Sequence, residues 1–165
     1  PPQGIAQGAQ PILSYNYGAQ NTERVKQTYR LLLKTCLIYS VTVWTAVMLF
    51  PSVFVSIFTP DEMLIAFASK ALRVYFGGMV LFGIQIACQM TFVSLGNALS
   101  SVTVAVVRKF VLLLPLIYIV PRLISDSTLG VYMAEPIADI IAVTFTAILF
   151  TFQFKKALAK IETKE

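Results

Sequence analysis

Residues 74–107 read VYFGGMVLFGIQIACQMTFVSLGNALSSVTVAVV, a run of 34 positions without a charged side chain. A second uncharged run, TCLIYSVTVWTAVMLFPSVFVSIFTP, fills the 26 positions 35–60. A helix needs about 20 apolar residues to cross the hydrocarbon core of a bilayer, so both runs are long enough to do so. These two stretches predict a protein whose solvent is the membrane.

The composition agrees with a membrane protein and excludes several classes of enzyme. Of the 165 residues, 57% are hydrophobic and 13% are charged, whereas a soluble domain has about 25% charged residues. The chain has no histidine, which excludes His-based triads and HExxH zinc sites, and it lacks glycine-rich phosphate-binding motifs. Cys36 and Cys88 lie in apolar runs, where a thiol acts as a small hydrophobe. We therefore expect no enzyme, no bound metal and no cofactor.

The sequence predicts an all-α, polytopic membrane bundle with four spans, near residues 30–57, 67–98, 101–120 and 130–154. Lipid admits only helices or closed barrels, and these runs lack the alternation of barrel strands. Short polar links join the spans, so consecutive helices should run antiparallel. The overlong second span should have an interfacial first part, through Arg73.

The basic residues predict the orientation of these spans. The net charge is +5, but the basic residues flank apolar runs, which indicates contact with a lipid bilayer and no nucleic acid partner. Three lie on one side, namely Lys70, Arg73 and Arg122. Ten lie on the other, namely Arg24, Lys26, Arg30, Lys34, Arg108, Lys109, Lys155, Lys156, Lys160 and Lys164. The richer side is expected to be cytoplasmic, with both ends of the chain and the tail 155–165 on it.

Two acidic residues in the fourth span are the main candidates for function. Glu135 and Asp139 stand four apart, on one face of a helix, and Asp139 lies about 14 Å inside the membrane if the helix begins at Gly130. A coupled pair of this kind could bind and release protons or cations. Alternatively, the acids serve packing, with Glu135 stabilised by the helix dipole or by Arg122.

Other polar residues inside the spans are weaker candidates for a substrate or ion site. Gln85 and Gln89 in the second span could coordinate a ligand or bond a neighbouring helix. Tyr39 and Thr42 belong to a stripe of polar and small residues in the first span, which should face the bundle interior. The proline at 115 in the third span and that at 136 in the fourth predict bends. Arg108 and Lys109 are expected to snorkel towards the cytoplasmic interface.

Several short motifs resemble those of one transporter family. They are GAQP at 8–11, SYNYGA at 14–19, GN at 96–97, Pro115, Gly130 and AEPIAD at 134–139. In this order they are similar to the multidrug and toxic compound extrusion (MATE) transporters, most closely to the bacterial branch of MepA-like efflux pumps.

The resemblance implies a fold of twelve helices in two lobes. Residues 1–17 would be the end of helix eight, and the four spans would be helices nine to twelve. The partner would then be the missing N-terminal lobe, in the plasma membrane of a bacterium. The resemblance also implies export of amphipathic, often cationic drugs, driven by protons or sodium. The sodium-coupled branch has an acid on its tenth helix, where this chain has only Gln85 and Gln89.

Two other functions remain open from the sequence alone. A lipid or polysaccharide flippase of related fold would be expected to have a more basic cavity. A membrane scaffold subunit without transport activity would use Glu135 and Asp139 for packing only.

Overall fold

The computed structural model describes residues 2–124 and 127–162. The described residues form helices and no strand. In chain order these are α1 (Pro2–Gly18), α2 (Thr22–Leu49), α3 (Pro51–Ser56), α4 (Glu62–Tyr75), the 3₁₀ segment η1 (Phe76–Leu81), α5 (Phe82–Ser94), α6 (Ala98–Val106), the π-helical segment η2 (Val107–Leu113), α7 (Leu114–Leu123) and α8 (Ser127–Glu162).

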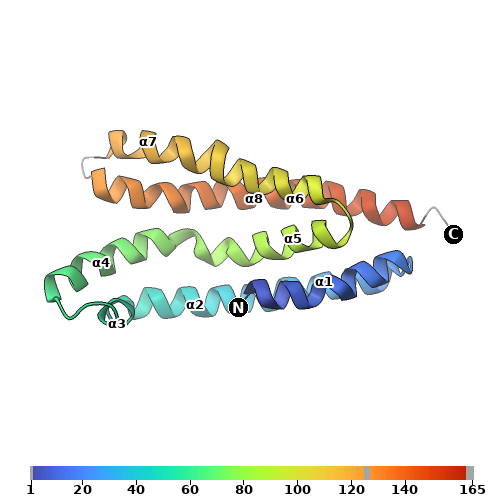
Figure 1. The fold of residues 1–165 in the computed structure, drawn as a ribbon, viewed down its shortest axis with the longest axis horizontal. Coiled ribbons are helices and arrows are strands. Elements are labelled where there is room, and N and C mark those ends of the chain that lie inside the picture. Colours follow the sequence, from blue (N-terminus) through green and yellow to red (C-terminus); the bar gives the residue numbers. More distant parts are fainter. Residues whose placement is uncertain (1, 125–126, 163–165) are drawn as a thin grey trace.

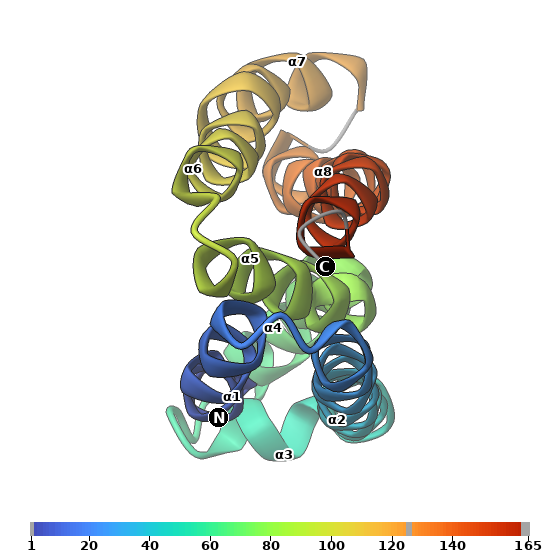
Figure 2. The ribbon, with the colours of Figure 1, turned by 90° about the vertical axis from the view of Figure 1, so that its right-hand side faces the viewer.

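Four helical stretches in the described residues are long and apolar enough to cross a membrane: Thr22–Leu49, Glu62–Ser94, Ala98–Leu123 and Thr128–Ile161. They run antiparallel along one axis, as Figure 1 shows. Seen end-on, α5 lies between the α1 and α2 pair on one side and α6 and α8 on the other (Figure 2). The all-α membrane bundle predicted from the sequence is confirmed.

The first span begins and ends earlier than the expected range 30–57. The side chain of Asn21 accepts a hydrogen bond from the backbone N–H of Arg24 and so caps the start of α2. The helix stops at Leu49 because Pro51 disfavours helical geometry at the preceding residue and starts the short helix α3 instead.

The second span, expected near 67–98 with an interfacial first part through Arg73, consists of α4 and α5 joined by a break. Asp61 caps the start of α4 by accepting hydrogen bonds from the N–H groups of Met63 and Leu64. The break is η1, which contains Gly77 and Gly78. A 3₁₀ stretch inside a long helix is typical of hinges and strained sites.

The third span contains the π-helical segment η2 immediately before Pro115. The backbone N–H of Leu114 donates to the carbonyl of Lys109, five residues earlier. Pro115 has no N–H to donate to the residue four before it, and its ring crowds that carbonyl, so the preceding turn widens. Near Pro115, where the sequence predicts a bend, the structure thus has a π-helical segment.

The fourth span, α8, extends through the expected tail as far as Glu162. The remaining residues of the tail, 163–165, lie outside the described residues, as do positions 125 and 126 of the expected link before this span. The last turns of α8 contribute Leu158 and Ile161 to a core cluster with α1, α2 and α5. The described part of the tail therefore packs on the bundle through Leu158 and Ile161.

The helices pack most tightly where small residues meet. Ala87 is fully buried in α5. A Cβ atom added to Gly83 would lie 2.6 Å from the carbonyl oxygen of Cys36 in α2. Small side chains let helix backbones approach closely in membranes. A second cluster, near the other face of α5, joins Cys88, Phe92 and Phe150.

Candidate functional site

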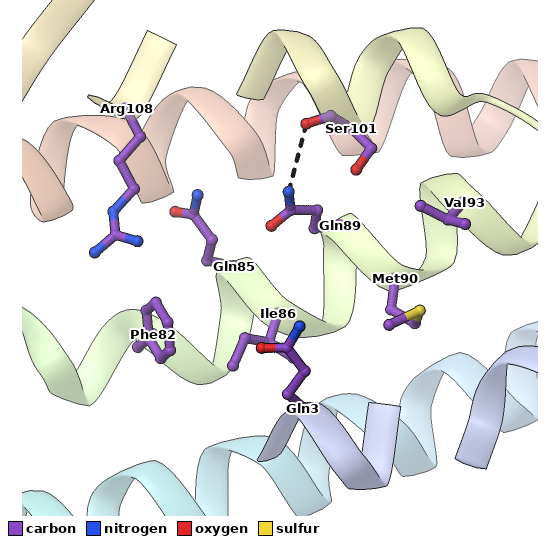
Figure 3. A pocket seen from close by; sticks show the side chains of 9 residues that line it. All are labelled: Gln3, Phe82, Gln85, Ile86, Gln89, Met90, Val93, Ser101 and Arg108. Carbon is purple, nitrogen blue, oxygen red and sulfur yellow. Dashed lines mark hydrogen bonds between the residues drawn. The ribbon is translucent and has the colours of Figure 1, made fainter. Parts of the chain in front are cut away.

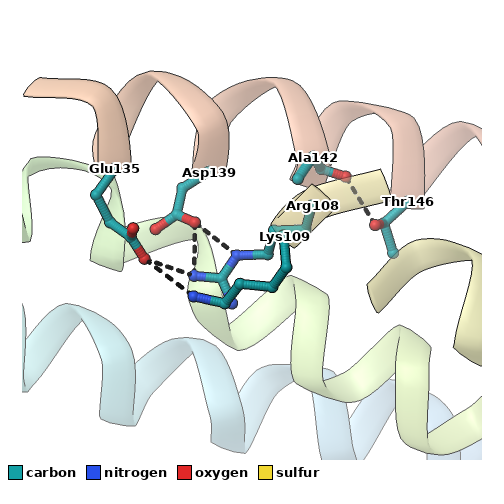
Figure 4. Close-up of polar contacts among 6 residues, drawn as sticks. All are labelled: Arg108, Lys109, Glu135, Asp139, Ala142 and Thr146. Atoms are coloured by element: carbon teal, nitrogen blue, oxygen red, sulfur yellow. Dashed lines mark hydrogen bonds and ion pairs between the residues drawn. The ribbon is translucent and has the colours of Figure 1, made fainter. Parts of the chain in front are cut away.

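The polar centre of the bundle is a cluster of four charged residues from two neighbouring helices (Figure 4). Arg108 Nε donates to Asp139 Oδ1 at 2.7 Å, and Arg108 Nη2 lies 2.6 Å from the same oxygen. Glu135 Oε1 accepts from Arg108 Nη2 at 3.5 Å and lies 3.6 Å from Lys109 Nζ. We call Arg108, Lys109, Glu135 and Asp139 the charge cluster.

The charge cluster forms because the two helices that carry it run antiparallel with opposite charges at similar depth. Glu135 and Asp139 stand one helical turn apart in α8 and face the π segment η2. The side chains of Arg108, Glu135 and Asp139 are 15%, 14% and 10% exposed, whereas Lys109 is 53% exposed. Two positive and two negative groups balance there, which lowers the cost of keeping charges in a low dielectric.

The structure corrects the expected role of Arg108. Sequence reasoning directed its side chain towards the cytoplasmic interface, but the guanidinium binds Asp139 inside the bundle. Its Cζ also lies 5.1 Å from the centre of the Phe82 ring, in a cation–π contact. Glu135, for which Arg122 was one alternative partner, lies close to Arg108 and Lys109.

A cavity of about 170 Å³ opens beside the two carboxylates, and we call it the acidic cavity. Its wall includes Glu135 and Asp139 from α8 and the aromatic side chains of Tyr75, Phe76 and Phe82. Aromatic faces and carboxylates together attract organic cations. The guanidinium of Arg108 lines this cavity and occupies that environment.

A second cavity, of about 270 Å³, is lined mainly by α5 together with residues of α1, α6 and η2, and we call it the amide cavity. Gln85 and Gln89, both predicted site residues, line it with Arg108 and Ser101 (Figure 3). The amide of Gln89 donates to the Ser101 carbonyl at 3.5 Å. Gln85 is 2% exposed, and its Oε1 has no hydrogen-bond partner among the described residues.

Four of the six predicted site residues line the two cavities, Glu135 and Asp139 the acidic one and Gln85 and Gln89 the amide one, and two lie elsewhere. Tyr39 and Thr42 line neither the acidic nor the amide cavity. Thr42 is exposed on α2, and its hydroxyl donates to the carbonyl of Ile38 at 2.7 Å. The buried face of α2 carries Val25, Leu32, Cys36, Ser40 and Val47 instead.

The first described turn of α1 also reaches the amide cavity. Gln3 lines it together with Gln85 and Arg108. α1 begins about half-way along the long axis of the bundle and ends beside the start of α2 (Figure 1). The expectation that both ends of the chain lie on the cytoplasmic side stays a prediction.

Comparisons with known proteins agree on one family. Residues 1–119 match the family model MatE. The fold is similar to that of the MATE multidrug transporter DinF-BH, which was solved in complex with a ligand, with 32% identity and a TM-score of 0.86. That match covers 96% of this chain and 35% of the transporter.

An inward-facing multidrug resistance MATE transporter of the MOP superfamily shares the fold at 19% identity, with a TM-score of 0.84 and coverage of 96% of this chain and 36% of that one. No curated protein matches. The chain thus spans about one third of the length of these transporters. The MepA-like branch stays a prediction, whereas the resemblance read from the motifs is confirmed: the chain belongs to the multidrug and toxic compound extrusion (MATE) family.

Proposed function

We propose that this chain forms most of the C-terminal lobe of a multidrug efflux antiporter, which exports amphipathic or cationic compounds by alternating access. The observation that carries the proposal is the charge cluster, in which Arg108, Glu135 and Asp139 are largely buried and line the acidic cavity. Ionised side chains at membrane depth are costly, and in membrane proteins they mark ion and substrate pathways. Here the carboxylates of Glu135 and Asp139 face a cavity with aromatic walls.

The required partner is an N-terminal lobe of the same transporter. Alternating access needs a second body against which this one can rock. Large apolar side chains are exposed over much of the surface, for example Phe110, Tyr118 and Phe152. Lipid and the second lobe would cover such residues in a bacterial plasma membrane.

The coupling ion would be a proton or sodium, bound in competition with the drug. Glu135 and Asp139 on α8 offer the carboxylates that line the acidic cavity. The amides of Gln85 and Gln89 would contribute polar contacts to the drug from the amide cavity. A flippase for anionic lipids or polysaccharides is less well supported, because the charge cluster has as many acidic as basic groups.

The proposal is tested by drug efflux from vesicles that contain the full-length protein. We expect uptake of a fluorescent cationic drug into inverted vesicles when a proton or sodium gradient is imposed, and collapse of that uptake when an ionophore dissipates the gradient. A scaffold subunit would give vesicles whose drug content is the same with and without the gradient. A lipid flippase would move labelled lipid and leave the drug behind.

A further inference from the structure

The guanidinium of Arg108 occupies a site that has the features of an organic-cation receptor. Asp139 contacts it at 2.6 and 2.7 Å, and the centre of the Phe82 ring lies 5.1 Å from its Cζ. Tyr75 and Phe76 complete the aromatic wall of the acidic cavity. An arrangement of aromatic faces and a carboxylate is how proteins recognise alkylammonium and guanidinium groups.

Arg108 lines both the amide cavity and the acidic cavity, as Phe82 does. The volumes are about 170 Å³ on the acidic side and about 270 Å³ on the amide side. Small-molecule sites measure about 300–1,000 Å³. Displacement of the guanidinium towards Gln85 would add the space that it now fills to the acidic cavity.

The amide cavity contains an acceptor for a displaced guanidinium. Gln85 Oε1 is buried and has no hydrogen-bond partner among the described residues. An unpaired buried acceptor costs about 1–3 kcal/mol, so a protein that retains one has a reason to do so. In Figure 3 the Gln85 amide and the Arg108 guanidinium extend into the same cavity from opposite helices.

An entering cation can pair with Asp139 only if the guanidinium releases that carboxylate. With Arg108 in place, Arg108 and Lys109 already neutralise Glu135 and Asp139. A further cation beside them would add uncompensated charge in a low dielectric. Exchange of one cation for another keeps the carboxylates paired.

The backbone that carries Arg108 departs from regular α-helix geometry. η2 is π-helical from Val107 to Leu113, and π segments often occur at functional sites. The resident side chain is therefore carried by an irregular turn of the third span.

We propose that Arg108 is the resident occupant of an organic-cation site, and that an alkylammonium or alkylguanidinium group of the substrate binds Asp139 and Phe82 by displacing the Arg108 guanidinium towards Gln85. The inference rests on the proposed export of cations and deepens it. Arg108 is then a specificity-determining residue, because a substrate binds only if its cationic group competes with the guanidinium.

Chemical rescue of Arg108→Ala tests the site without transport. The purified full-length protein is melted with increasing ethylguanidinium, a free counterpart of the missing side chain. We expect the Tm of Arg108→Ala to fall below that of the wild type and to rise by several degrees, with saturation, on addition of ethylguanidinium. Asp139→Asn combined with Arg108→Ala should abolish the rise, and Arg122→Ala is the matched control on the same span. Equal shifts in all variants would overturn the proposal.

A second measurement covers the case that Arg108→Ala does not fold. Gln85→Leu removes the acceptor for the displaced guanidinium and leaves the acidic cavity intact, so tetramethylammonium should bind this variant about tenfold more weakly than the wild type. Unchanged affinity contradicts displacement towards Gln85. The two proposals fail separately. If the protein exports drug but shows neither the rescue of Tm by ethylguanidinium nor the weaker binding by Gln85→Leu, only the resident-cation site is refuted. If the rescue occurs in a protein that exports no drug, only the export function is refuted.

Discussion

Gly78 in η1 approaches α8 so closely that a Cβ atom added to it would lie 2.9 Å from Cβ of Asp139. The same atom would lie 3.0 Å from Cα of Pro136 and 3.3 Å from its carbonyl oxygen. Contacts below 3.0 Å force a neighbour to move, and here the neighbours are a backbone and the base of a short side chain. The 3₁₀ break in the second span thus brings two glycines against the helix that carries both acids.

Gly78→Ala is therefore expected to destabilise the bundle and displace Asp139 from Arg108. Overpacking of a tight contact costs about 1–3 kcal/mol. The control is Gly77→Ala, because its added Cβ would meet Pro136 at an ordinary 3.7 Å. Melting of the two purified variants checks the prediction, and equal Tm values would show that η1 can shift without cost.

The aromatic cluster near the end of α8 gives a second prediction. The ring of Phe150 lies 4.6 Å from Tyr29, 4.9 Å from Phe154 and 5.3 Å from Phe92, centre to centre. Phe150→Ala should cost about 3–5 kcal/mol through lost contacts and a cavity. Phe152→Ala, at a position that is 71% exposed, should melt close to the wild type. If Phe150→Ala lowered the stability no more than Phe152→Ala does, the aromatic cluster would make no special contribution to the stability of the bundle.

The spans and both acids of the site could be predicted from the sequence, because the absence of charge over long runs and the spacing of Glu135 and Asp139 are local signals. The depth of Asp139 pointed correctly to burial: its side chain is 10% exposed. Helix ends set by capping, such as Asn21 before α2, were harder to place because apolar character does not end where the helix ends.

The partner of the acids was missed for a different reason. Arg108 was assigned to the interface from its place in one helix, whereas its partner lies in another. Counting depth from both ends would have helped, since residues in antiparallel neighbours meet when their depths match. The stripe with Tyr39 and Thr42 misled because hydroxyls can bond their own helix, as Thr42 does with Ile38.

The orientation is a third prediction. The end of α3 and the last turns of α8 lie at opposite ends of the bundle (Figure 1), and the positive-inside rule places the α8 end in the cytoplasm. A cysteine in place of Lys156 should react with an impermeant maleimide only from the cytoplasm, and one in place of the 88% exposed Phe58 only from outside. The native Cys36 and Cys88 are buried and provide an unlabelled background. Labelling of both sites from one side would contradict this topology.

The last prediction separates the two acids of the charge cluster. Asp139 makes the short contacts to Arg108, at 2.6 and 2.7 Å, whereas Glu135 lies 3.5 Å from Arg108 and 3.6 Å from Lys109. Asp139→Asn keeps the volume and removes the charge that binds either the guanidinium or a substrate cation. Export by the full-length protein should fall several-fold at near wild-type expression, since Glu135 still offers Arg108 a counter-charge. Glu135→Gln is the matched control and should reduce export less. Efflux and expression are measured on the same vesicles. If Asp139→Asn exported drug as the wild type does, this carboxylate would have no role in transport. The lobe would then only line the cavity.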